Sequence, residues 1–316
     1  MVLTRSVSAA DVRAAEARIR PYVRRTPLLA LGQTSRRALP WDVVLKLESL
    51  QVTGSFKPRG ALNALLGLPR AQIERGVVTA SGGNHGLGVA YAARRLGVPA
   101  TVYVPETAPA VKREGIAAWG ADVRLAGREY AVAAEAAHDD ADRSGRPYLH
   151  AYADAPIIAG QGTVALEFLE DAGRPLDYLL IAVGGGGLIA GMAAYAVEEG
   201  GPTVIGVEPE GAATLHAALA AGGPVDLDRL DSLAADALGA RRVGDLNYAL
   251  ARQHVARVAL VPDREIVAAQ EFLWDEAQTV AEPGGAAALA ALLSGAAEIP
   301  KGARVGVLVC GANTTR

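Results

Sequence analysis

The stretch Ile181–Glu199, IAVGGGGLIAGMAAYAVEE, joins an apolar run to an alanine-rich run through four consecutive glycines. An apolar strand that ends in glycine and leads into a helix is typical of a parallel sheet with crossover helices. The N–H groups of Gly184–Gly187 can converge on an anion at the start of that helix. The stretch therefore predicts an α/β fold with a phosphate site, and a tight structural turn is the alternative.

The same alternation extends over most of the chain. Helices are expected between most of the predicted strands, for example from Asn84 to Leu96, where Gly97 and then a proline end the helical pattern. The compact units from 76 to 153 predict a small domain inserted into a large one made of 1–75 and 154–316. The predicted strands cover 42–48, 76–80, 100–105, 121–126, 147–151, 177–183, 203–209, 255–261 and 303–310.

Composition limits the class of protein. The 316 residues carry a formal net charge of −3, which argues against nucleic acid or an anionic membrane as the main partner. The single cysteine, Cys310, excludes an internal disulfide framework. No apolar run reaches the roughly 18 residues of a membrane span. We therefore expect a cytoplasmic protein that binds a small molecule.

Lys57 has an unusual position in the stretch TGSFKPRG (53–60), because Pro58 suits the first position of a helix. The residue before a proline avoids helical geometry, so Lys57 is predicted to cap the helix that follows. Its ammonium group would face the positive end of the helix dipole, which favours the neutral amine. A neutral amine is a nucleophile, and only four of the 31 basic residues are lysines.

A second glycine turn, Ser81–His85, lies between a predicted strand and a predicted helix. Its exposed N–H groups, hydroxyl, amide and imidazole would suit a carboxylate. The alternative is that Ser81 and Asn84 only cap the helix.

Three further features leave their roles open. Cys310 ends the last predicted strand, where ligands bind in α/β sheets, but an isolated cysteine is often a buried small side chain. Glu282 could stabilise a helix start or face the cleft. Glu208 ends the strand that follows the four glycines, as a ribose-binding acid would, so a nicotinamide-cofactor protein is an alternative, although the G-x-G-x-x-G spacing is not met.

Six motifs occur in an order that resembles the pyridoxal-phosphate enzymes of fold type II. They are TGSFKPRGALN, SGGNHG, IAGQGT, VGGGGLIAG, AEPGGA and CGAN, and the resemblance runs from about Thr26 to Asn313. The group that this chain most resembles is that of the serine/threonine dehydratases, to which serine racemase is related. The resemblance implies two open, mostly parallel sheets with flanking helices, in which the large domain binds pyridoxal 5'-phosphate and the small domain closes over the substrate.

The resemblance also implies roles for individual residues. Lys57 would carry the cofactor as a Schiff base and act as the catalytic base, Phe56 would pack on the cofactor ring, and Asn84 would bind the ring hydroxyl. Gly184–Gly187 would hold the phosphate, and Cys310 would face the pyridine nitrogen. The remaining implied site residues are Glu282 for the cofactor, and Ser81, Gly82, Asn84 and His85 for the substrate.

The implied reaction is α,β-elimination, which converts L-threonine or L-serine into a 2-oxo acid and ammonia. β-Replacement and a non-catalytic pyridoxal-phosphate or amino-acid binding module remain alternatives. Racemisation is a further alternative, but Gly82 stands where the racemases have a serine that acts as an acid. We expect a homodimer that binds a small amino acid.

Other departures concern the cation site and the substrate pocket. Glu208, the carbonyl of Ala212 and Thr214 match a divalent-metal site with one carboxylate missing, which suits a monovalent cation if any. Ala237 replaces the glycine that usually follows the aspartate at 236. Because the sequence ends soon after Asn313, the regulatory domain of biosynthetic threonine dehydratases is not expected.

Overall fold

The computed structural model describes residues 6–32 and 36–314, and both predicted types of element are present. No helix among these residues combines the length and the apolarity needed to cross a bilayer. The strands are β1 (Leu28–Ala30), β2 (Asp42–Leu47), β3 (Val77–Ala80), β4 (Ala100–Val104), β5 (Asp122–Leu125), β6 (Tyr178–Ala182), β7 (Thr203–Pro209), β8 (Arg257–Val261) and β9 (Arg304–Val309). The helices are α1 (Ala9–Ile19), η2 (Glu48–Leu50), α2 (Lys57–Leu66), α3 (Arg70–Ile73), α4 (Asn84–Leu96), α5 (Ala110–Ala118), α6 (Tyr130–Ser144), α7 (Ala155–Asp171), α8 (Gly187–Glu198), η3 (Glu210–Ala212), α9 (Thr214–Ala221), α10 (Ala235–Leu238), α11 (Asp245–His254), α12 (Asp263–Ala277) and α13 (Pro283–Leu293).

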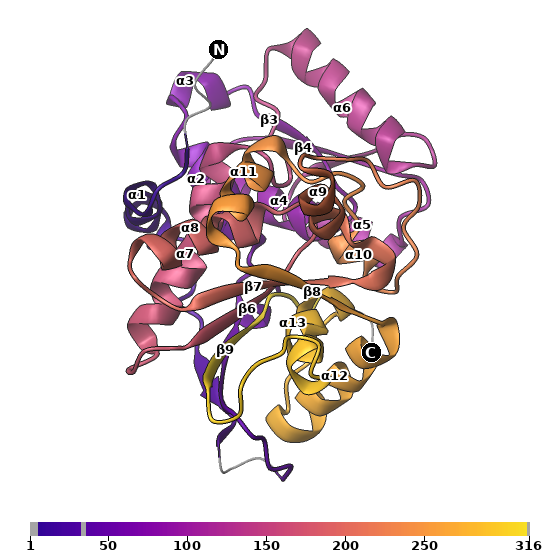
Figure 1. Ribbon diagram of the computed structural model, residues 1–316. Coiled ribbons are helices and arrows are strands. Elements are labelled where there is room, and N and C mark those ends of the chain that lie inside the picture. The colour runs from indigo at the N-terminus through magenta and orange to yellow at the C-terminus, as the bar shows by residue number, and fades with distance from the viewer. Residues whose placement is uncertain (1–5, 33–35, 315–316) are drawn as a thin grey trace.

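A six-stranded sheet forms the centre of the larger lobe, with the strand order β1-β2-β9-β6-β7-β8. All neighbouring strands run parallel except β1, which is antiparallel to β2. The inner strands are almost fully buried runs of valine, leucine and isoleucine, as expected for a parallel sheet covered on both faces. Helices α12 and α13 lie on one face, and α7, α8 and α11 lie on the other (Figure 1).

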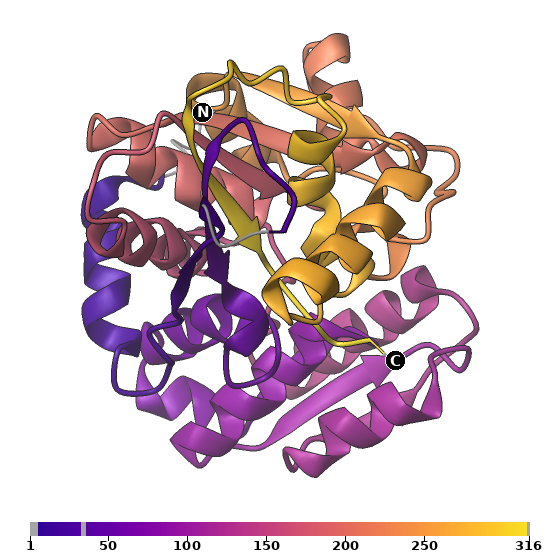
Figure 2. The same cartoon turned by 90° about the horizontal axis from the view of Figure 1, so that it is seen from below.

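A three-stranded parallel sheet, in the order β3-β4-β5, forms the smaller lobe with α4, α5 and α6. Figure 2 shows this violet-to-magenta part of the chain gathered on one side of the molecule, next to the C-terminal segment. Leu62 and Leu65 of α2 share a buried core with Val77 and Val89, so α2 packs against the smaller lobe. It also packs against α7 of the larger lobe. The predicted boundaries between the two domains, at residues 76 and 154, remain a prediction.

The strand predicted at 147–151 is wrong, because this segment forms only an isolated bridge between Val78 and Tyr148. Its hydrogen bonds to β3 end where the N–H of Leu149 donates to Val78. The ring nitrogen Nδ1 of His150 then accepts the N–H groups of Tyr152 and Ala153, which turns the chain away from the sheet. The other predicted strands agree with the structure to within about two residues, which is the usual uncertainty of strand ends.

Candidate active site

The predicted cofactor residues line one narrow inner cavity with a volume of about 40 Å³. Gln161, in the segment IAGQGT, lines it as well. Of the predicted residues, the lining contains Phe56, Lys57, Asn84, Gly184, Gly185, Gly186, Gly187, Glu282 and Cys310. These residues come from both lobes and from distant parts of the chain, so only the tertiary fold brings them together. Their individual roles remain predictions.

Lys57 begins helix α2, and its predicted role as the capping residue is wrong. Phe56 takes that place with φ −60° and ψ −16°, which puts Lys57 in the first turn. The Lys57 ammonium Nζ donates to the carbonyl of Ala151 at 2.9 Å and lies 5.1 Å from the centre of the Phe56 ring. Burial lowers the pKa of Lys57 to about 8, although Cys310 and Glu282 partly oppose this shift. About a tenth of the Lys57 side chains are therefore neutral amines at pH 7, and about half at pH 8.

Close contacts with two other helices fix the start of α2. A Cβ atom added to Gly88 of α4 would lie 3.0 Å from the backbone carbon of Lys57 and 3.1 Å from its Cβ. A Cβ added to Gly160 of α7 would lie 2.6 Å from the carbonyl oxygen of Arg59. Both positions require glycine because helix backbones approach more closely than a side chain allows. The backbone that carries Lys57 is thus held from two sides.

A buried network of four charged side chains also holds helix α2 in place. The guanidinium of Arg59 donates to both carboxylate oxygens of Glu48, at 2.8 and 2.7 Å, and to both of Glu167, each at 2.8 Å. Lys46 donates to Glu167 at 2.9 Å. All four side chains are buried, so two cations balance two carboxylates. No motif in the sequence indicates this network.

The four glycines form a turn between β6 and α8 whose shape suits an anion. Gly186 has φ +87°, a conformation that favours glycine, and α8 starts at the next residue. Among the described residues, no backbone hydrogen bond of a turn, loop or helix cap uses the N–H of Gly184, Gly185, Gly186 or Gly187 as its donor. Unpaired N–H groups at the start of a helix are the usual ligands of a phosphate. A Cβ on Gly185 would lie 2.4 Å from the ring of Tyr152, so a larger residue would not fit there.

Asn84 is held by two partners that sequence analysis did not connect with it. Its amide nitrogen donates to Glu282 Oε1 at 2.6 Å, and its amide oxygen accepts from Asn313 at 2.7 Å. Asn313 also donates to the carbonyl of Thr53 at 2.7 Å. Burial raises the pKa of Glu282 to about 7, although the hydrogen bond from Asn84 lowers it. One N–H of Asn84 is left to bind a ligand in the cavity.

Cys310 follows β9 and is buried in the cavity wall. Its thiol donates a long hydrogen bond, 3.5 Å, to the carbonyl of Gly284. Burial raises the pKa of the thiol well above its usual range, and Glu282 raises it further. Cys310 is therefore a neutral group and brings no negative charge to this side of the cavity.

The turn before α4 differs from a simple helix cap. Gly83 is the capping residue and no side chain accepts the first helical N–H groups, while the Ser81 hydroxyl accepts the N–H of Gly83 at 3.2 Å. His85 Nε2 lies 3.2 Å from the carbonyl of Leu149, and burial lowers the pKa of His85 to about 3. The imidazole is neutral, so Nε2 carries the proton and Nδ1 is an acceptor. The side chain of His85 thus offers no free donor to a carboxylate, whereas the Ser81 hydroxyl and the backbone N–H groups do.

The predicted cation residues have other partners in the structure. The carboxylate of Glu208 is fully buried and accepts the N–H groups of Leu215 and His216, both at 2.8 Å, which caps α9. Thr214 donates to the carbonyl of Ala240 at 2.6 Å. Within residues 6–32 and 36–314, no group of three His, Cys, Asp or Glu side chains could hold a metal ion. Because Glu208 is enclosed in this way, it is not placed to bind a ribose.

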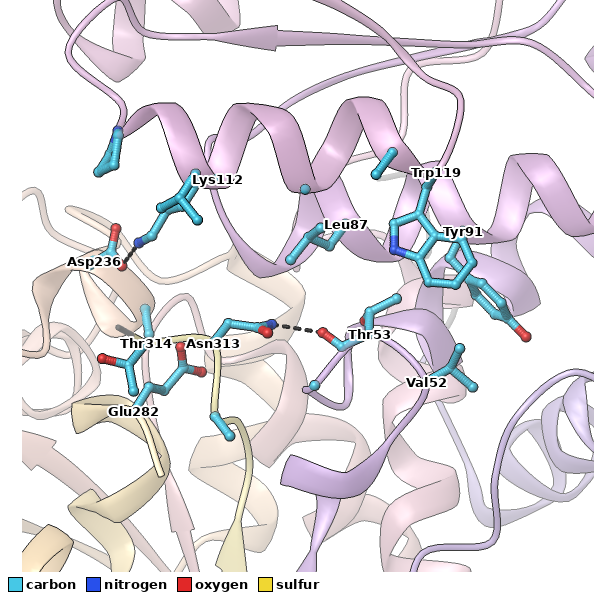
Figure 3. A pocket seen from close by; sticks show the side chains of 18 of the residues that line it. Val52, Thr53, Leu87, Tyr91, Lys112, Trp119, Asp236, Glu282, Asn313 and Thr314 are labelled. Atoms are coloured by element: carbon cyan, nitrogen blue, oxygen red, sulfur yellow. Dashed lines mark hydrogen bonds and ion pairs between the residues drawn. The ribbon is translucent and has the colours of Figure 1, made fainter. Parts of the chain in front are cut away.

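A wider outer cleft lies next to the inner cavity and shares Ala237 and Glu282 with it. Its volume is about 1290 Å³. Figure 3 shows Leu87, Tyr91 and Trp119 on its smaller-lobe side. At one end, Lys112 of α5 and Asp236 of α10 form an ion pair across the cleft.

The groups that line the inner cavity have the chemistry needed to bind pyridoxal 5'-phosphate. The cofactor needs an amine for its aldehyde, donors for its phosphate and a partner for its ring hydroxyl. Lys57, the glycine N–H groups and the remaining N–H of Asn84 supply these, in that order. Sequence reasoning assigned no role to Tyr152 or Asn313: Tyr152 lies outside the six motifs, and Asn313 is the last residue of CGAN, which was its only signal.

Comparison with known proteins identifies the family. The model of the family "Pyridoxal-phosphate dependent enzyme" matches residues 19–311. The biosynthetic L-threonine dehydratase of Mycobacterium leprae is 43% identical over 98% of this chain and 73% of its own length. The phenylserine dehydratase of Ralstonia pickettii is 40% identical over 94% of this chain and 90% of its own length.

Solved structures show the same likeness. Maize serine racemase superposes with a TM-score of 0.91 at 32% identity, covering 98% of this chain and 95% of that chain. The processed form of threonine deaminase isoform 2 from Solanum lycopersicum superposes with a TM-score of 0.91 at 31% identity, covering 100% of this chain and 88% of that chain. The match of the family model over most of the sequence agrees with the chemistry of the inner cavity, and this chain belongs to the pyridoxal-phosphate dependent enzymes.

Proposed function

We propose that this enzyme dehydrates a β-hydroxy α-amino acid, L-threonine or L-serine, to a 2-oxo acid and ammonia. The observation that carries the proposal is the partly neutral amine of Lys57 in one cavity with an anion-binding glycine turn and a neutral Cys310 thiol. Relatives named threonine dehydratase, at 37–43% identity, support the reaction class.

Lys57 is the proposed base. Pyridoxal 5'-phosphate, when bound, supplies the electron sink that makes loss of an α-proton possible. Nζ of Lys57 is close to half neutral at a pH near 8, so it can take up a proton there without first losing one to water. The carbonyl of Ala151 accepts a hydrogen bond from Nζ and thereby orients it.

The turn Ser81–His85 is the proposed binding site of the substrate carboxylate. The unpaired N–H groups at the start of α4, which include those of Asn84 and His85, and the Ser81 hydroxyl can all donate to an anion. Gly82 has no side chain that could give or take a proton. For that reason we propose elimination as the main activity, and racemisation as the weaker alternative.

A bulkier substrate is a second candidate. The phenylserine dehydratase relative and the outer cleft lined by Leu87, Tyr91 and Trp119 both favour a β-hydroxy amino acid with an aromatic substituent. The cleft adjoins the inner cavity at Ala237, so a ring that extends from the β-carbon would have apolar neighbours there.

A product assay tests these proposals. Purified protein with pyridoxal 5'-phosphate is incubated with L-threonine, L-serine, D-serine or L-threo-phenylserine, and 2-oxo acid and ammonia are measured. We expect equal amounts of both products from at least one L-substrate, and none from the Lys57→Ala variant. A new thioether formed when a thiol is added would support β-replacement, and D-serine formed from L-serine would support racemisation. Bound cofactor without any of these products would support a binding module instead.

We also propose that the protein is a homodimer, and that it is cytoplasmic, as its composition favours. A monovalent cation at Glu208, Ala212 and Thr214 is a further candidate. Light scattering on a sizing column would report the mass in solution. Activity measured in potassium, sodium or a large organic cation would show whether the enzyme requires a monovalent cation. Equal rates in all three would exclude a cation requirement.

A further inference from the structure

Asn247 lies behind the glycine turn and outside the inner cavity. It belongs to α11, which packs against α8, and its side chain is fully buried. Its amide nitrogen donates to the carbonyl of Gly185 at 2.6 Å and to the carbonyl of Tyr152 at 3.0 Å. Its amide oxygen has no hydrogen-bond partner among the described residues. Because both close neighbours are acceptors, only the nitrogen end of the amide can face them.

The hydrogen bond to Gly185 sets the direction of a peptide plane. In a trans peptide the C=O of Gly185 and the N–H of Gly186 point in opposite directions. When Asn247 holds the Gly185 oxygen on its own side of the turn, the N–H of Gly186 must point away from Asn247. The N–H of Gly244 donates to the same oxygen at 3.4 Å, which is a weaker contact.

A run of four glycines needs such a restraint more than other sequences do. Glycine adopts positive and negative φ with similar ease, so a peptide between glycines can flip at little cost. A flip between Gly185 and Gly186 would turn a carbonyl oxygen towards the anion in place of an N–H. The hydrogen bond from Asn247 opposes that flip.

The second hydrogen bond ties the turn to the segment that covers it. The ring of Tyr152 fills the space where a Cβ of Gly185 would lie, and the Tyr152 carbonyl fills the space of a Gly187 Cβ. The N–H of Tyr152 donates to His150 Nδ1, so the backbone of this residue is held on both sides. One amide group therefore satisfies two carbonyl oxygens that would otherwise present negative charge close to an anion site.

We propose that Asn247 is a positioning residue for the cofactor phosphate, which it serves by fixing the peptide plane between Gly185 and Gly186 so that the N–H of Gly186 faces the anion. The inference rests on the glycine turn being the phosphate site of the proposed enzyme. It predicts that loss of the Asn247 donor weakens the binding of the phosphate and leaves the binding of the rest of the cofactor unchanged.

The test compares two ligands that differ only in the phosphate. Dissociation constants of pyridoxal 5'-phosphate and of pyridoxal are measured by absorbance for wild type, Asn247→Asp and Asn247→Leu. We expect both variants to lower the ratio of the pyridoxal constant to the pyridoxal 5'-phosphate constant by about tenfold, the value of one lost hydrogen bond in a buried site. A general loss of folded protein changes both dissociation constants by the same factor and therefore cancels in their ratio.

His254→Gln is the matched control, because His254 is a buried residue about 10 Å further along α11. It should leave the ratio at the wild-type value. An unchanged ratio in Asn247→Leu would overturn the proposal, and so would a loss confined to Asn247→Asp, since that would reflect charge alone. Equal affinity of the wild type for both ligands would instead show that the glycine turn is not the phosphate site.

Discussion

At the scale of single residues, the site depends on burial more than on ion pairs. Burial lowers the pKa of Lys57 and of His85, and it raises the pKa of Glu282 and of Cys310. In each case burial favours the neutral form of the group over its charged form, because charged groups lose hydration inside the protein. The inner cavity therefore holds a nucleophilic amine and a neutral thiol at the same pH, and the imidazole of His85 in the turn before α4 is neutral as well.

Lys57 gives the first prediction. Its pKa of about 8 in the cofactor-free protein means that the fraction of reactive amine rises about tenfold per pH unit below pH 8 and levels off above it. The rate at which the apoprotein takes up pyridoxal 5'-phosphate should follow the same curve in stopped-flow absorbance. Lys57→Arg, which keeps the charge but has no titratable amine, should show no uptake. A rate that keeps rising to pH 10 would contradict the lowered pKa.

Glu282 gives a prediction about stability. Its pKa is about 7 in the folded protein and about 4.5 in the unfolded chain, so the folded state binds the proton more tightly. The resulting stability is fully present below pH 4.5 and is lost as the pH rises through 7. Glu282→Gln should remove this loss, a difference on the order of 3 kcal/mol in urea unfolding of the apoprotein at pH 8 compared with pH 4.5. Exposed Glu271→Gln is the control, and equal slopes for both variants would refute the prediction.

At the scale of helices, the position of Lys57 depends on how closely α2, α4 and α7 approach. Glycine at the points where these helices cross lets their backbones come into contact. The buried ion pairs of Arg59 next to these points oppose a shift of α2 along its neighbours. The motif SFKPRG thus contains both the reactive amine and, two residues later, the guanidinium that anchors its helix.

Gly88→Ala tests the helix contact. The new Cβ would meet Lys57 at 3.0–3.1 Å, so we expect a loss of about 1–3 kcal/mol in the free energy of unfolding, together with weaker cofactor binding. Gly115→Ala on α5 has only Leu87 nearby, at 3.5 Å, and should gain about 0.5–1 kcal/mol from helix propensity. Opposite signs in urea titrations support the contact, and a stabilising Gly88→Ala would count against it.

Arg59→Leu tests the buried network. It leaves the carboxylates of Glu48 and Glu167 without their main partner, which costs about 3–5 kcal/mol for a buried pair. Arg25→Leu removes a largely exposed arginine that also bonds two carboxylates, those of Glu170 and Asp171, and should cost less than about 1 kcal/mol. Chemical unfolding of the two variants measures the difference. Similar losses of unfolding free energy in the two variants would mean that burial does not determine the cost of removing the arginine.

At the scale of the whole molecule, two sets of side-chain contacts join the lobes at the cleft. Asn84 links α4 of the smaller lobe to Glu282 and Asn313, and the ion pair of Lys112 with Asp236 closes one end of the outer cleft. Asp236 is largely exposed, so this pair is open to solvent and salt. We infer that it holds the lobes together weakly and reversibly.

Lys112→Met and Asp236→Asn test that inference. An exposed pair is worth about 0.2–1 kcal/mol, so each variant should raise KM by at most about fivefold with kcat little changed. At about 1 M salt, where screening is strong, wild type and variants should have the same KM. Asp231→Asn, which breaks an exposed pair within one loop, should have no effect. A salt-independent difference in KM would contradict a role in closing the cleft.

The sequence by itself determined the alternation of strands and helices, the glycine turns and the one lysine in an unusual position. These features depend on neighbours a few residues apart, so hydrophobic periodicity, proline and glycine are enough to reveal them. The helix of Asn84–Leu96 and most strands follow from such patterns, whereas the strand expected at 147–151 was lost to a side-chain contact of His150.

Only the tertiary structure decided which distant segments meet at the site. The carbonyl of Ala151 on Lys57, the amide of Asn313 on Asn84 and the amide of Asn247 on the glycine turn join positions between 62 and 229 residues apart. No local pattern encodes such contacts, because they depend on how whole helices and sheets pack. The same packing sets the burial that makes His85 and Cys310 neutral, which composition and spacing do not show.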